Sequence, residues 1–295
     1  MKAQVTSFWE WQQRYSNDDT CLAELAKLRW PEGFQCPHCG HDHGWLLSSR
    51  SIYECSQCHR QCSVTAGTLF HASKVSLTKW FWAIYWVSSD KGSVSALRLT
   101  KLLGLSWRTA NKMLRKLRTA MGHQDSLYRL HGVIELDDAL VGGKRAGKRG
   151  RGAAGKTPIL VACEHNDGKP GFVALQAVTS INHETVRQFA DRHLDLGQRV
   201  HTDALPALNS LTESQHQVAK VTPPAQACEW LPWVHVVISN FKTFILGTYH
   251  GVSGQYLQEY LNEYSYRLNR RFWEPEIPNR LLRLAIRHQP VIFST

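Results

Sequence analysis

Apolar positions along the chain follow two different periods, and these divide it into a largely helical first part and a mixed second part. In the first part, apolar residues recur at helical spacing over 8–28, 77–88, 93–103 and 106–118, with short strand-like runs at 45–47 and 51–55. In the second part, strand-like runs cover 133–141, 157–163, 171–178, 199–203 and 217–221. Helical patterns cover 184–194, 204–211, 232–246 and 256–271.

The order of elements in the second part is typical of one architecture. A strand, a hairpin across Asn166–Pro170, and then helices alternating with single strands is the order of the ribonuclease H-like α/β fold. The change of period near Gly132 also indicates domain limits. We predict three segments: residues 1–75, 76–130 and 131–295, the last including the C-terminal helices.

Four of the eight cysteines form two C-x-x-C pairs separated by fifteen residues, a spacing typical of a tetrahedral zinc site. A thioredoxin-like redox motif needs one pair only. A disulfide pairing fits poorly, because the first residues lack the apolar stretch of a secretory signal. The sequence therefore predicts a structural zinc ribbon held by Cys36, Cys39, Cys55 and Cys58. Alternative ligands close by are Cys62, His38, His41, His43 and His59, whereas Cys21, Cys163 and Cys228 are expected to be ordinary thiols.

A helix-turn-helix follows the predicted ribbon. The run 93–103 places Leu99, Leu102 and Leu103 on one face, and Gly104 suits the end of a helix. Ser106 suits the start of the next helix, whose apolar stripe is Met113, Leu114 and Leu117. Two helices joined by a short turn with glycine are typical of this motif. The residues predicted to face DNA are Arg108, Asn111, Lys112 and Arg115, although a solvated basic face on a helical hairpin remains the alternative.

Net charge points to a polyanionic partner. The chain carries 35 Lys and Arg against 24 Asp and Glu, a net charge of +11. Between Lys91 and Gln124 it has eight basic residues and no acidic one. The run 142–156 has six basic residues and six glycines without the spacing of a nucleotide-binding P-loop. We predict that this loop follows DNA through Lys144, Arg145, Lys148, Arg149 and Arg151.

Carboxylates mark two of the predicted strands. Asp137 lies in the run 133–141, which also carries Glu135 and Asp138, and Asp203 ends the run 199–203. A carboxylate on a buried strand is costly unless a partner compensates its charge. A divalent cation that prefers hard oxygen ligands, such as magnesium or manganese, compensates it well. A solvated strand end is the alternative for either residue alone.

Taken together, these motifs are similar to those of one family. The chain resembles a bacterial insertion-sequence transposase of the DDE superfamily, in the zinc-ribbon-bearing ISXO-like lineage, over nearly its whole length. The segments that carry the resemblance are the two cysteine pairs, Gly67–Lys74, Ile134–Gly143, His201–Asp203, Gly247–Ser253 and Tyr266–Arg271.

The resemblance implies a set of catalytic residues. Asp137 and Asp203 match the first two acidic positions of the family. The third position, usually Glu or Asn seven residues before a Lys, is His235 here, with Lys242 as the matching Lys. Seven residues are about two helical turns, so both side chains share a helix face. Asn240 and Glu229 are rivals for the third position.

The activity implied is transposition. It comprises binding of terminal inverted repeats in double-stranded DNA, then magnesium- or manganese-dependent cleavage and strand transfer by Asp137, Asp203, His235 and Lys242, in a homodimer or larger assembly. The zinc ribbon would be structural. Two other functions stay open: a DNA-binding regulator with an inactive nuclease-like domain, which His235 favours, and a ribonuclease H-like host nuclease or resolvase. The sequence predicts a cytoplasmic, nucleoid-associated protein without a membrane-spanning segment, since its most apolar window, 80–87, is too short.

Overall fold

The computed structural model describes residues 7–142, 155–213, 215–221 and 226–293. Contacts group the chain into two compact units, residues 121–272 and residues 1–120 together with 273–295. This grouping differs from the predicted segment 131–295. Helix α10 (Ile277–Arg287) packs against α3 and α2 of the unit that contains the N-terminal residues, because its apolar face, with Leu281 and Ala285, is buried there.

The unit formed by 1–120 and 273–295 combines helices with one small antiparallel sheet. Its elements are α1 (Phe8–Arg14), α2 (Asp18–Arg29), β1 (Gly44–Leu47), β2 (Ile52–Cys55), β3 (Gln61–Ser63), α3 (Leu77–Ser89), α4 (Ala96–Leu103), most of α5 (Trp107–Asp125) and α10. Capping boxes begin α1 at Ser7 and α2 at Asn17. The aromatic helix α3 buries Trp80 and Phe81, as expected for a core helix.

The helix pair α4–α5 has the predicted turn. The Oγ of Ser95 caps α4, Gly104 ends it with φ of 60°, and the Oγ of Ser106 accepts from the Thr109 N–H at 3.2 Å. Glycine suits this left-handed position because it has no Cβ. Leu99 and Leu103 are buried as expected. Leu102 is partly exposed, because the narrow stripe of an eight-residue helix covers only positions 99 and 103.

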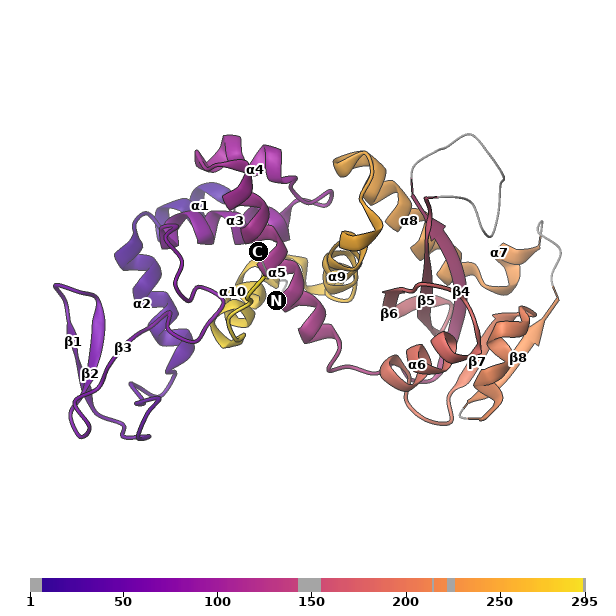
Figure 1. The fold of residues 1–295 in the computed structure, drawn as a ribbon, viewed down its shortest axis with the longest axis horizontal. Coiled ribbons are helices and arrows are strands. Elements are labelled where there is room, and N and C mark those ends of the chain that lie inside the picture. The colour runs from indigo at the N-terminus through magenta and orange to yellow at the C-terminus, as the bar shows by residue number, and fades with distance from the viewer. Residues whose placement is uncertain (1–6, 143–154, 214, 222–225, 294–295) are drawn as a thin grey trace. The chain divides into compact units, whose positions relative to one another are not determined.

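Residues 121–272 fold around a five-stranded sheet (Figure 1). Its elements are β4 (Val133–Val141), β5 (Thr157–Asn166), β6 (Lys169–Ala177), α6 (His183–His193), β7 (Arg199–Asp203), β8 (His216–Lys220), α7 (Ala227–Trp230), α8 (Pro232–Tyr249) and α9 (Leu257–Leu268), with 3₁₀ turns at Pro206–Glu213, Gly254–Tyr256 and Arg271–Glu276. The segment after β7, predicted to be helical, is the first of these 3₁₀ turns.

The strand order is β6-β5-β4-β7-β8. β4, β5 and β6 are antiparallel neighbours, whereas β7 pairs parallel to β4 and β8 parallel to β7. The hairpin between β5 and β6 turns at Asp167 and Gly168, both at positive φ, as the turn residues predicted. Helix α8 covers one face of this sheet and α6 the other. The predicted ribonuclease H-like α/β fold is confirmed.

The two arginines that follow the end of α9 are structural. Arg270 donates to the Asp125 carboxylate at 2.7 Å and lies over the Tyr266 ring, and Arg271 donates to the carbonyls of Pro170 and Gly171. Arg270 and Arg271 therefore serve packing within residues 121–272. Within the described part of the chain, no helix has the length and apolar character needed to cross a membrane.

Candidate catalytic face and zinc site

The two C-x-x-C pairs converge at one end of the small sheet. The Sγ atoms of Cys36 and Cys58 lie 3.6 Å apart, as do those of Cys39 and Cys55, and all four lie within 4.8 Å of one another. Zn–S bonds of about 2.3 Å place the sulfurs of a tetrahedral site about 3.7 Å apart. The four thiols therefore fit a zinc ion in number, chemistry and spacing.

Backbone turns hold the two pairs in place. The Gly40 N–H donates to the Cys36 carbonyl at 2.9 Å, and the His59 N–H donates to the Cys55 carbonyl at 3.0 Å. Although desolvation opposes it, hydrogen bonds from the backbone N–H groups of Cys39 and His38 lower the pKa of Cys36 to about 6. A thiol of low pKa is readily deprotonated, as metal binding requires. At Cys39, despite a hydrogen bond from the His41 N–H, burial and the neighbouring thiols raise the pKa to about 12. Cys62 is buried in β3 beside the four, outside the cluster. The thiols of Cys21 and Cys163 are buried, as expected.

The sheet brings the two predicted aspartates onto one face. β4 and β7 run parallel, with Leu136 opposite Thr202, so Asp137 and Asp203 follow this pair side by side. Side chains alternate between the two faces of a strand. Leu136 lies in the core beneath α6, whereas Ala139, of the same parity as Asp137, lies in the core beneath α8. Both carboxylates therefore belong to the face that α8 covers.

His235 reaches this face from the first turns of α8. Its Nε2 lies 3.0 Å from Oδ2 of Asp137, although 98 residues separate the two positions. The imidazole is one quarter exposed and the carboxylate 15% exposed, so the pair is mostly shielded from water. Lys242 is exposed on the same helix. The structure thus brings together two of the predicted catalytic residues that lie far apart along the chain.

Burial and nearby negative charges both disfavour the ionised form of Asp137. Burial first, and then the charges of Asp138 and Asp203, raise the pKa of its carboxyl to about 6, while His235 acts in the opposite direction. Negative charge concentrated in a buried place favours a divalent cation. The Oδ1 of Asp203 accepts from the Leu205 N–H at 3.1 Å. Among the described residues, the four cysteines are the only group whose ligating atoms all lie within 4.8 Å of one another, so Asp137, Asp203 and His235 share a face without forming so compact a set.

The rivals for the third position lie elsewhere. Asn240 is exposed on α8, and Glu229 is exposed in the separate short helix α7. Neither has a contact with Asp137 among the described hydrogen bonds and ion pairs, which include that of His235. Of the three candidates, His235 is therefore the one that the fold places at Asp137.

Sequence reasoning assigned no role to Glu135. This residue of β4 is fully buried, and its Oε2 accepts from the backbone N–H groups of Trp233 and Val234 at 2.8 and 2.9 Å. Its Oε1 lies 3.0 Å from Nδ1 of His165. The sequence did place Glu135 near Asp137, because residues two positions apart on a strand lie on the same face of the sheet. The partners of Glu135 could not be read from that pattern.

The predicted DNA-contacting residues are partly available. Arg108 and Lys112 are exposed on α5 and Asn111 is half-buried, whereas the guanidinium of Arg115 lies 4.1 Å from the centre of the Phe293 ring. Two further basic residues of α5 are buried, Lys116 and Arg118, so they do not add to a basic surface. The loop residues Lys144, Arg145, Lys148, Arg149 and Arg151 lie outside the described residues.

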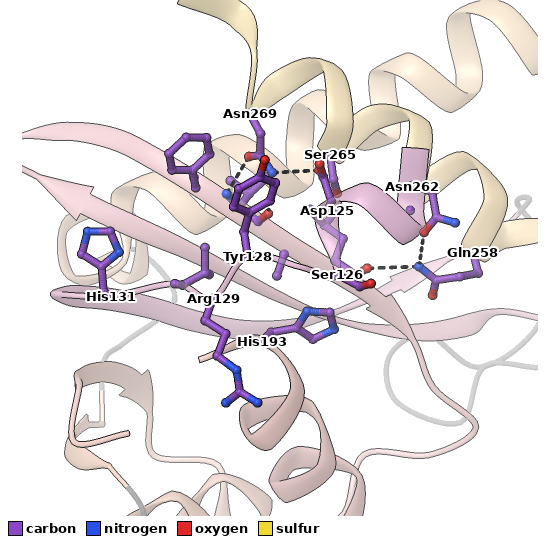
Figure 2. Close-up of a pocket in the computed structure, with 16 residues that line it drawn as sticks. Asp125, Ser126, Tyr128, Arg129, His131, His193, Gln258, Asn262, Ser265 and Asn269 are labelled. Atoms are coloured by element: carbon purple, nitrogen blue, oxygen red, sulfur yellow. Dashed lines mark hydrogen bonds between the residues drawn. The ribbon is translucent and has the colours of Figure 1, made fainter. Parts of the chain in front are cut away.

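The best-formed cavity is not at the catalytic face. It holds about 150 Å³ and lies among the end of α5, β6 and α9 (Figure 2). Asp125, Arg129, His193 and Asn262 are among its lining residues. None of the predicted catalytic, metal or DNA-contacting residues lines it. Asp137 and Asp203 therefore lie outside this cavity, on the inner strands β4 and β7 of the sheet.

These features define an α/β protein with a ribonuclease H-like domain behind a zinc ribbon. The family model of the ISXO2-like transposase domain matches residues 129–269, and that of the transposase zinc-ribbon domain matches residues 16–61. Together they cover more than half of the chain. The protein belongs to the zinc-ribbon-bearing ISXO2-like family of insertion-sequence transposases.

Individual relatives are distant. An uncharacterised protein in the transposable element ISH50 of Halobacterium salinarum is 26% identical over 207 residues, which cover 64% of this chain and 68% of the relative. Among solved structures, a pre-cleavage Mos1 transpososome is similar with a TM-score of 0.30 at 11% identity, covering 68% of this chain and 76% of that chain. A Mos1 transposase paired-end complex with the left transposon end has a TM-score of 0.26 at 12% identity, with 64% and 72% covered.

Proposed function

We propose that this protein is the transposase of an insertion sequence, which binds the terminal inverted repeats of its element and catalyses metal-dependent DNA cleavage and strand transfer. One observation carries the proposal. In a chain of this family, Asp137 and Asp203 occupy neighbouring positions on one sheet face, and His235 reaches the same face and contacts Asp137. The convergence of three residues so distant in sequence on one sheet face is what a catalytic centre requires.

Each of the three residues has a role in this proposal. Asp137 and Asp203 would hold magnesium or manganese through carboxylate oxygens, with the His235 imidazole as the third ligand. When bound, the metal activates the attacking oxygen and stabilises charge on the reacting phosphate. Lys242, exposed on the helix that carries His235, binds a DNA phosphate near the cleaved bond.

The same face serves two displacements at phosphorus. In the first, the oxygen of water bonds to phosphorus at the element's end, and the leaving 3′-oxygen takes up a proton to become a free hydroxyl. In the second, this hydroxyl loses its proton and its oxygen bonds to phosphorus in the target strand, whose 3′-oxygen leaves. Both steps are in-line exchanges of one oxygen for another, so one set of residues suffices.

DNA binding is assigned to the basic surfaces outside this face. Arg108 and Lys112, exposed on α5, are the most accessible of the predicted contacts. With Asn111 and Arg115 they form the proposed reading face of the helix-turn-helix. The loop residues Lys144, Arg145, Lys148, Arg149 and Arg151 are proposed to add salt-dependent contacts to phosphate that are independent of sequence. The active form is proposed to be at least a dimer, because two ends must be joined.

A cleavage assay on short duplexes that carry the terminal inverted repeats tests the proposal. We expect cutting only with magnesium or manganese, and a loss of at least about 10³-fold in Asp137→Asn and Asp203→Asn with end binding unchanged in gel shift. Glu229→Gln and Asn240→Ala alter the rival positions and should cut at the wild-type rate. Strand transfer by Asp137→Asn would contradict the assignment.

A second function is favoured by one observation. His235 occupies a position where an acidic residue or Asn is usual, which is the feature expected of a DNA-binding regulator with an inactive nuclease-like domain. The same assay separates the two, since a regulator binds the repeats without cutting at any metal concentration. A host resolvase, by contrast, cuts branched DNA whatever the terminal sequence. Inverted repeats on both sides of the gene would favour the transposase.

A further inference from the structure

Helix α8, which carries His235, has no cap of its own. The residue before it, Leu231, offers no side-chain hydrogen bond, and Pro232 at the first position has no N–H. The His235 N–H is the first to find a partner within the helix, the Leu231 carbonyl at 3.4 Å. Two donors of the first turn therefore need a partner from outside, the N–H groups of Trp233 and Val234.

Glu135 supplies that partner from another element. Its Oε2 accepts from both N–H groups, at 2.8 Å from Trp233 and 2.9 Å from Val234. The residue lies in β4, about a hundred positions earlier, and is fully buried. A carboxylate at a helix N-terminus also meets the positive end of the helix dipole. One side chain thus completes the hydrogen bonding of the first turn of α8.

The location of this contact gives it a consequence for the catalytic face. Glu135 precedes Asp137 by two residues on the same face of β4, and Val234 directly precedes His235. The two elements are therefore joined beside the point where His235 Nε2 lies 3.0 Å from Asp137. We propose that Glu135 is a positioning residue that sets the contact between His235 and Asp137. The inference rests on the proposed function of these two residues.

A histidine lies beside the other carboxylate oxygen of Glu135. Nδ1 of His165, on β5, lies 3.0 Å from Oε1 of Glu135, and its ring packs edge-on against the Trp233 ring with centroids 6.3 Å apart. The hydrogen bonds of the Glu135 side chain both belong to Oε2, which accepts from α8, whereas Oε1 has His165 only at ion-pair distance and accepts no hydrogen bond from the described residues. A fully buried carboxylate that accepts two backbone N–H groups from one helix has little freedom to move, which is the property that a positioning residue needs.

The chain contains a matched control for this residue. Glu164, on β5, is also buried and also accepts two backbone N–H bonds, from His131 at 3.1 Å and Phe172 at 3.0 Å. It too has a histidine beside it, with Nδ1 of His131 at 3.3 Å. Its parity places it on the opposite face of the sheet from Asp137. Glu164→Gln therefore removes the charge of a similarly buried and hydrogen-bonded carboxylate that does not contact α8.

The first test does not depend on activity. In the zinc-loaded protein without added magnesium or manganese, the ¹⁵N signal of His235 Nε2 reports its bond to Asp137. We expect Glu135→Gln to shift this signal toward that of an unbonded imidazole, and Glu164→Gln to leave it unchanged. In the wild-type protein, the amides of Trp233 and Val234 should exchange with solvent as slowly as those inside α8. An unchanged His235 signal in Glu135→Gln, or rapid exchange of both amides in the wild type, would overturn the proposal.

The second test is a kinetic comparison of the same variants. Glu135→Gln should lower kcat for cleavage of an inverted-repeat duplex by about 10- to 100-fold, with KM for the duplex unchanged. Glu164→Gln should retain the wild-type kcat. An equal loss of kcat in both variants would show that Glu135 has only a structural role. If the wild-type protein does not cut at all, the proposed function fails, while the imidazole signal still decides whether Glu135 sets the contact.

Discussion

Two carboxyl groups at the catalytic face, those of Glu135 and Asp137, have raised pKa values. Burial raises the pKa of Glu135, although N–H groups of α8 oppose the change. At Asp137, burial and the charges of Asp138 and Asp203 raise the pKa to about 6. Raised pKa values mean that the ionised carboxylates destabilise the folded chain. Such destabilisation is expected where a site is organised for a ligand that supplies the missing positive charge.

The destabilisation caused by ionised Asp137 should be measurable as a free energy of unfolding. The pKa of Asp137 is higher in the folded chain than in the unfolded chain. The contribution of this residue to the free energy of unfolding is therefore most favourable below about pH 4, and it decreases as pH rises toward 6. Asp137→Asn removes the ionisation. In the zinc-loaded protein without added magnesium or manganese, the variant should therefore be more stable than the wild type above about pH 6, by up to about 3 kcal/mol, and should lose this advantage near pH 4.

Urea unfolding at several pH values measures the difference. Asp167→Asn, in the exposed hairpin turn, is the control and should follow the wild type throughout. Equal stability of Asp137→Asn and the wild type at pH 8 would show that ionised Asp137 does not destabilise the folded chain.

At the scale of elements, the edge strand β6 is closed by side chains instead of another strand. The Val173 N–H donates to Asn269 Oδ1 at 2.8 Å, and Asn269 Nδ2 donates back to the Val173 carbonyl at 3.1 Å. Gln258 Oε1 likewise accepts from the Ala177 N–H at 2.8 Å, and its Nε2 lies 3.3 Å from the Leu175 carbonyl. Two amide side chains from the α9 region thus imitate a neighbouring strand, which protects an edge from pairing with other chains.

Removing one of these amides should open the edge locally. Gln258→Ala leaves the half-buried N–H of Ala177 without its partner. An unpaired N–H costs about 1–3 kcal/mol when fully buried, so we expect a cost toward the lower end of this range. We expect a lower urea midpoint and faster hydrogen exchange at Ala177, with self-association at high concentration detected by light scattering. Gln188→Ala, which removes an exposed amide from α6, should change none of these. Unaltered exchange at Ala177 would mean that water replaces the amide without cost.

At the scale of the whole molecule, the chain divides into two units with different sources of stability. Residues 121–272 bury an apolar core on each face of the five-stranded sheet. The ribbon in the other unit has three short strands and few buried side chains, but it has four converging thiols. A segment with so little core usually depends on a metal for its fold.

We therefore expect about one zinc ion per chain, and its removal should unfold the ribbon selectively. With a chelator, or in Cys58→Ser, protease should cut within residues 36–62 while residues 121–272 resist. Elemental analysis and mass spectrometry of the fragments give both readouts. Cys62→Ser, which changes the buried thiol beside the cluster, should keep its zinc. A chelated protein whose ribbon resists protease as before would exclude a structural role for the metal.

The sequence by itself determined those features whose signal is local. The two C-x-x-C pairs, the turn at Gly104, and the order of strands and helices in the sheet follow from short spacings and periods, because neighbouring residues set them. Asp137 and Asp203 were found for the same reason, as carboxylates on predicted strands. His235 required the family resemblance, and the structure supports it through the contact with Asp137.

Tertiary structure alone decided the features that depend on which distant segments meet. Packing of α10 with the N-terminal helices, the internal bonds of Arg270 and Arg271, and the closing of β6 by Asn269 and Gln258 have no local pattern. The same holds for Glu135, whose partners lie about a hundred residues away. A polar side chain finds its partner through the strand register and the path of the chain, and both are set by burial of the whole core rather than by the residues on either side.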